Sequence, residues 1–230
     1  MKYRILLFIT LAFQSLSYNQ TTETIRLADF TEISVFGRFT VDIKYSEEPF
    51  ANLTVGYDDV DADKVQFNYS GKKLTIKYIA SVINDKDLNI TIYAPNIHKV
   101  DARSGAQIRV NKSFILNNST VVLSSASGGK IKATVDTPWL EATVSQGGSV
   151  SVTGSATLFE AKVKTGGTIG AVNLDAKKVE AQINLGGEIM CYAEEILKAS
   201  VSGGGTISYT GPAEVKESIK LGGTIEKLNE

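Results

Sequence analysis

Acidic side chains form the densest cluster of potentially reactive groups in this sequence. The stretch "DDVDAD" places Asp59, Asp61 and Asp63 at alternate positions, the spacing with which carboxylates open a calcium-binding loop. Such a loop requires glycine at its sixth position and a bidentate glutamate at its twelfth, where this chain has Lys64 and Ser70. The pattern therefore favours a solvated loop or the acidic first turn of a short helix, and we predict no metal site.

A second set of carboxylates recurs at wide, regular intervals, at Glu141, Glu160 and Glu180. Stacked carboxylates repel one another, bind a cation, or act as the acid pair of a polysaccharide lyase. Lysines such as Lys162 and Lys164 stand close enough in sequence to neutralise them. We interpret this row as a mixed-charge, solvated wall.

Three single residues complete the candidates for chemistry. His98 is the one histidine, near Pro95, and we expect a surface or corner position. Cys191 is the one cysteine, so no intrachain disulfide forms, and we expect a small core residue because no histidine in the repeats could activate it. Trp139 could stack on a sugar, but we favour a role in covering the core edge. We predict no catalytic residue and no cofactor.

Composition limits the possible partners. The 230 residues include 20 glycines and 4 prolines, are 43% hydrophobic and carry a net charge of -1. That composition is typical of an ordered chain, and no basic excess points to nucleic acid.

The N-terminus has the features of a signal peptide. Lys2 and Arg4 precede "ILLFITLAF", an apolar run too short to span a bilayer, and the small residues "SLS" follow. We predict a signal peptide over 1–17, cleaved near Ser17 or Tyr18, then a linker over 18–29. No later run reaches spanning length, so we expect an exported protein without a membrane span, in the periplasm or at the surface of a bacterium.

Glycine pairs recur through the second half of the chain, and we expect them at the corners of a repeating coil. Their first members are separated by 18 to 20 residues: Gly128, Gly147, Gly166, Gly186, Gly204 and Gly222. Seven residues earlier stand Val121, Leu140, Phe159, Val179, Leu197 and Val215, and three residues later stand Ile131, Val150, Ile169, Ile189, Ile207 and Ile225. Glycine permits positive φ at a tight corner and close stacking of neighbouring coils.

This period predicts an all-β fold, a single-stranded parallel β-helix or solenoid with about 18–20 residues per coil. Each coil should hold about three short strands and three corners, wound right-handed by the usual crossover bias. Residues 30–95 alternate apolar and polar residues, as in "FTVDIKY" and "KLTIKY", and should form an irregular β-rich part that continues or caps the solenoid. The regular repeats span 97–227, so 30–227 form one domain.

Three stretches together resemble the putative auto-transporter adhesins with a head GIN domain. They are "FTEISVFGRFTVDIKYSEEP" leading into "GKKLTIKY", then "ITIYAPNIHKVDARSGAQI", then the glycine repeats, together covering about residues 30 to 225. The resemblance implies a β-helical, exported protein with an adhesive or structural role and no established catalytic residues. Its partner would be an unidentified glycan or a protein of the envelope or extracellular matrix.

Two functions remain open from the sequence. The first is a non-enzymatic, adhesin-like binding protein, and the alternative is a carbohydrate-active β-helix enzyme, a polysaccharide lyase or hydrolase acting on acidic glycans. The even coil length leaves no room for the long loops that build a catalytic groove. Because the outward positions before each glycine pair lack aromatics, we expect recognition at the corner loops or in the N-terminal part, where five tyrosines lie: Tyr45, Tyr57, Tyr69, Tyr78 and Tyr93.

Overall fold

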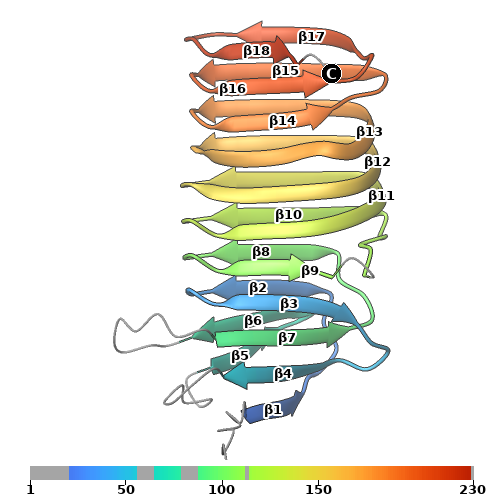
Figure 1. Ribbon diagram of the computed structural model, residues 1–230, viewed down its shortest axis with the longest axis vertical. Helices are drawn as coiled ribbons and strands as arrows, with labels where there is room; N and C mark the ends of the chain where they lie inside the picture. Colours follow the sequence, from blue (N-terminus) through green and yellow to red (C-terminus); the bar gives the residue numbers. More distant parts are fainter. Residues whose placement is uncertain (1–20, 56–64, 79–87, 112–113, 229–230) are drawn as a thin grey trace, which may run out of the picture.

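The chain winds into one elongated stack of β-coils (Figure 1). The computed structural model describes residues 21–55, 65–78, 88–111 and 114–228. All strands of these segments belong to one curled sheet, in which most neighbours pair in parallel. No helix occurs among the described residues, and hence none there could cross a membrane. The predicted parallel β-solenoid is confirmed.

Each coil has two walls, which face each other across the core (Figure 1). The first wall contains β6 (Lys73–Tyr78), β2 (Glu32–Phe36), β8 (Lys99–Arg103), β10 (Thr120–Ala126), β15 (Ile196–Gly203) and β17 (Glu214–Ile219). The second wall contains β7 (Leu88–Ala94), β3 (Thr40–Tyr45), β9 (Gln107–Val110), β14 (Glu188–Tyr192), β16 (Thr206–Thr210) and β18 (Thr224–Lys227). Among the described connections, a tight corner follows the first-wall strands β2, β8, β10, β15 and β17, and a bend follows the second-wall strands β7, β14 and β16.

Three long strands differ from the expected coil of three short strands. They are β11 (Lys130–Ser145), β12 (Gly148–Thr165) and β13 (Gly167–Leu185), and each starts on the second wall, passes through the bend and ends on the first wall. The β-pairing between neighbouring coils therefore continues through the bend, whereas it stops at the glycine corner. The expectation of three separate strands per coil is wrong for this part of the chain.

Inward side chains stack in register from coil to coil. Leu140, Phe159 and Val179 are aligned neighbours, and each is at most 1% exposed. Ser125 occupies an apolar register position, but its hydroxyl donates to the carbonyl oxygen of Gly129 at 2.6 Å and accepts from the Ser149 N–H at 3.2 Å. A buried hydroxyl with both bonds made is tolerated in the core.

The corners use glycine in two ways. At the earlier corners a non-glycine residue precedes a glycine and both have positive φ, as in Ser127 (50°) and Gly128 (74°). From Gly166 (64°) and Gly167 (121°) onward, both glycines of a pair have positive φ. The six first glycines all have φ between 64° and 109°, and a Cβ on any of them would meet nothing within 4 Å. The left-handed backbone, rather than crowding, is what demands glycine there.

The N-terminal part inserts one coil out of sequence order. Strand β2 lies between β6 and β8, and β3 lies between β7 and β9, all in parallel. The stack is extended by three antiparallel strands: β4 (Phe50–Val55) on β7, β1 (Thr21–Arg26) on β4, and β5 (Val65–Ser70) on β6. This part both continues the solenoid and extends it beyond its last parallel coil.

Candidate binding surface

The glutamates predicted to share a wall do form one ladder. Glu141, Glu160 and Glu180 are aligned on the first wall, and Lys198 follows Glu180 in register. The Lys198 Nζ lies 2.7 Å from the Glu180 Oε1, with both side chains about half exposed. This is a solvated ladder of mixed charge, as interpreted from the sequence. The aspartates Asp59, Asp61 and Asp63 lie outside the described residues.

The single residues singled out from the sequence lie far apart. Cys191 is fully buried on β14, and burial raises the pKa of its thiol to about 12. His98 precedes β8, half-exposed, with its Nε2 3.9 Å from the Glu32 carboxylate. Trp139 is 39% exposed on the outer side of the first wall, between Thr120 and Leu158, so it does not cover an edge of the core.

The four described tyrosines of the N-terminal part do not gather into one cluster. Tyr45 is 56% exposed, whereas the Tyr69 hydroxyl accepts a hydrogen bond from the Ala28 N–H at 3.1 Å. Tyr78 packs edge-on against Phe39, and Tyr93 stacks on Phe50 with ring centroids 4.2 Å apart. Tyr57 lies outside the described residues. The described tyrosines therefore form no shared binding surface, because most of their rings contact other residues of the chain.

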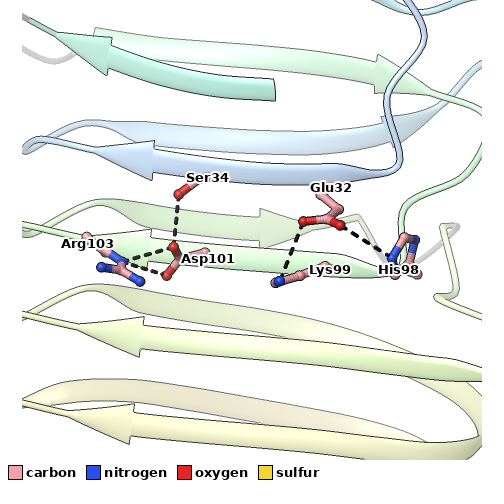
Figure 2. Close-up of polar contacts among 6 residues, drawn as sticks. All are labelled: Glu32, Ser34, His98, Lys99, Asp101 and Arg103. Carbon is pink, nitrogen blue, oxygen red and sulfur yellow. Dashed lines mark hydrogen bonds and ion pairs between the residues drawn. The ribbon is translucent and has the colours of Figure 1, made fainter. Parts of the chain in front are cut away.

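A buried polar cluster joins the inserted strand β2 to β8 (Figure 2). The Asp101 carboxylate accepts hydrogen bonds from the Ser34 hydroxyl at 2.9 Å and from the Arg103 Nε at 2.9 Å. On the same strands, the Lys99 Nζ lies 3.5 Å from Glu32. Ser34 is fully buried and Asp101 is 5% exposed, so these contacts hold the out-of-order coil in its register.

A hollow of about 630 Å³ lies beside the tight corners that follow β2, β8 and β10, next to the start of β7. Its lining includes Thr40, Asn89, Gln107, Lys130 and Arg38. The first four come from β3, β7, β9 and β11, which are adjacent in the second wall but distant in sequence. No local motif joins these residues, and only the out-of-order coil brings Thr40 between Asn89 and Gln107.

Comparison with known proteins identifies the family. The model of the family described as "Putative auto-transporter adhesin, head GIN domain" matches residues 29–213. The chain belongs to this family. No curated protein matches it.

Solved structures share the head GIN fold over nearly their whole length. A putative adhesin from Bacteroides fragilis is 23% identical, with a TM-score of 0.82 over 92% of this chain and 98% of that one. A putative lipid binding protein from Parabacteroides distasonis is 22% identical, with a TM-score of 0.68 over 93% and 98%. A putative adhesin from Parabacteroides merdae is 20% identical, with a TM-score of 0.69 over 93% and 98%. At this identity the likeness establishes the fold.

Proposed function

We propose that this head GIN protein is an exported, non-enzymatic binding protein of the bacterial envelope, with an adhesin-like role. The observation that carries the proposal is the nearly continuous register of the solenoid, which shifts by one residue between Ser151 and Thr153. From β10 to β18 the coils stack with no inserted loop longer than a tight corner or bend, so each wall presents outward side chains in straight ladders. A rigid surface of this kind suits recognition of an extended extracellular partner.

Catalysis on polysaccharide fits this surface less well. An acid/base pair needs carboxylates set in a groove that holds the substrate. Glu160 and Glu180 line an open hollow of the first wall together with lysines, and Glu180 is already paired with Lys198. Family membership also supports a binding role, because the family is named for adhesins.

The binding role is tested with the purified, processed protein on an array of glycans and extracellular matrix proteins. We expect saturable binding to at least one immobilised glycan or matrix protein. In parallel, pooled acidic polysaccharides are incubated with the protein and assayed for new reducing ends and unsaturated products. Release of either product would favour the enzyme, and an array without a saturable signal would contradict the binding role.

Export is tested separately, because residues 1–17 lie outside the described residues. Intact-mass analysis of the protein produced in a bacterium with an outer membrane should show loss of a segment ending near Ser17. A chain that retains Met1 and stays in the cytoplasm would contradict export.

A further inference from the structure

The hollow at the tight corners is floored by a ladder of four polar side chains in one register. Thr40 is aligned with Asn89 on one side and with Gln107 on the other, and Gln107 is aligned with Lys130. Neighbouring strands lie about 4.8 Å apart, so the ladder is about 14 Å long. It presents an amide, a hydroxyl, a second amide and an ammonium group in a row.

The corners around this ladder leave room for a ligand. The aliphatic stem of Arg38 lies against Gly105, where an added Cβ would stand 2.9 Å from the Arg38 Cγ. Glycine at position 105 therefore allows Arg38 to lie over the corner beside the ladder. The resulting volume of about 630 Å³ falls within the range of small-molecule binding sites.

The hydrogen-bonding capacity of the ladder is unused. Within the described parts of the chain, the side chains of Thr40, Asn89, Gln107 and Lys130 make no hydrogen bond or ion pair. On the same strands, two residues further along, Arg109 makes two hydrogen bonds to the Asp42 carboxylate, at 2.8 and 3.0 Å. The Asp42 and Arg109 side chains thus satisfy each other, whereas the side chains of the four-residue ladder have no protein partner among the described residues.

The described lining of the hollow carries charge of one sign. It contains the cation Lys130, and no aspartate or glutamate occurs among the described residues that line it. Two other hollows differ: one on the first wall combines Glu160 and Glu180 with lysines, and one at the bend combines Asp136 with Lys177. An anionic group is therefore favoured at the corner hollow, and Lys130 is the cation on which this argument depends.

We propose that this hollow binds an anionic sugar, a pyranose that carries a carboxylate, sulfate or phosphate group. Amide and hydroxyl side chains donate and accept hydrogen bonds, which matches the hydroxyl groups of a sugar, and an ammonium group binds an oxyanion. The site rests on the proposed binding function and specifies its ligand class. It also places recognition at the corners of the N-terminal half instead of on the glutamate ladder.

The test is a ligand-observed NMR titration of the processed protein with glucuronic acid, glucose 6-sulfate, glucose 6-phosphate and glucose. We expect at least one anionic sugar to bind about tenfold more tightly than glucose, because a hydrogen-bonded oxyanion contributes that much. The three anions differ only in the charged group, so the strongest of them identifies its chemistry. Equal affinity for glucose and all three anions would overturn the proposal.

Variants locate the site. Lys130→Gln should weaken binding of the preferred anion about tenfold and leave glucose unchanged, whereas Gln107→Ala should weaken both sugars. The matched controls on the first wall, Lys178→Gln and Gln182→Ala, should bind as the unaltered protein does. Gln107, Lys130 and Lys178 are exposed, and Gln182 is partly buried with a hydrogen bond to Asn184, so circular dichroism and thermal unfolding check that each variant keeps the fold. Undiminished binding by Lys130→Gln would overturn the proposal.

The array and the titration fail in distinguishable ways. If the array shows binding but no anionic sugar binds in the titration, the hollow is not the site and the binding function stands. If the array shows no binding, the adhesin-like function fails, and the titration still decides whether the hollow takes an anionic sugar.

Discussion

The carbonyl oxygen of Gly148 lies so close to Gly167 that a Cβ added to Gly167 would stand 2.5 Å from it. The same contact between second glycines recurs at later corners, at 2.7 Å for Gly187, 2.8 Å for Gly205 and 2.9 Å for Gly223. First glycines have open space at the Cβ position. The two members of a pair therefore have separate roles: the first allows a left-handed backbone, and the second allows the next coil to approach.

Replacing the two members of one pair should therefore give unequal effects. Gly166→Ala should cost about 1 kcal/mol, because its φ of 64° is a left-handed conformation that other residues adopt with modest strain. Gly167→Ala should cost about 3 kcal/mol or more, because φ is 121° and the Cβ meets backbone. Denaturant unfolding measures both. Equal losses would contradict the division of roles.

The buried contact between Ser34 and Asp101 should couple the two residues energetically. Asp101→Ala should cost about 2 kcal/mol, because it leaves the buried Ser34 hydroxyl without its acceptor. The partner Arg103 is about half exposed, so its ion pair adds little. In a double-mutant cycle, Ser34→Ala combined with Asp101→Ala should cost about 1 kcal/mol less than the sum of the single changes. Strict additivity would contradict the coupling.

The buried Cys191 thiol should make the folded protein less stable in alkali. Burial raises the pKa of its thiol from 9.0 to about 12, so the folded chain holds this proton more tightly than the unfolded chain. The contribution is fully present below pH 9 and is lost as the pH rises from about 9 toward 12. Compared with Cys191→Ala, the unaltered protein should lose more stability across that window. Parallel curves would contradict the prediction, as would rapid reaction of the native thiol with a disulfide reagent at pH 8.

Repulsion within the glutamate ladder should lower the stability of the fold slightly. Glu160 lies between Glu141 and Glu180, so Glu160→Gln should raise stability by about 0.5 kcal/mol at low ionic strength. The gain should disappear at high salt, because these charges are exposed to screening. Glu188→Gln is the matched control, since Glu188 is aligned with Thr168 and Thr206. A gain that persists at high salt would contradict an electrostatic cause.

The repeating half of the fold was predictable because one signal sets both the period and the inward register. Each glycine pair marks a corner, and positions such as Phe159 and Ile169 then fall in the core. The bend carries no mark in every coil: proline stands there at Pro95, Pro138 and Pro212 but not in the other coils, so the long continuous strands were not predicted. The same alternation predicted that Cys191, two residues after the inward Ile189, points into the core, and the residue is fully buried.

The N-terminal order and the corner hollow could not be predicted in the same way. Strands β2 and β3 have the alternation of any half-buried strand, which specifies a face but no neighbour. Their place is fixed by long-range contacts such as the one between Ser34 and Asp101. The hollow then follows from that placement, because Asn89, Thr40 and Gln107 become neighbours only when β3 lies between β7 and β9.

The most direct test of where this head GIN protein binds is lysine footprinting in the presence of the glycan selected on the array. Surface lysines are acetylated with and without the glycan, and the modified sites are quantified by mass spectrometry. We predict protection of Lys130, with no protection of Lys198 and Lys216 on the ladder of the first wall. Protection of Lys198 and Lys216 with Lys130 left reactive would contradict recognition at the corner hollow.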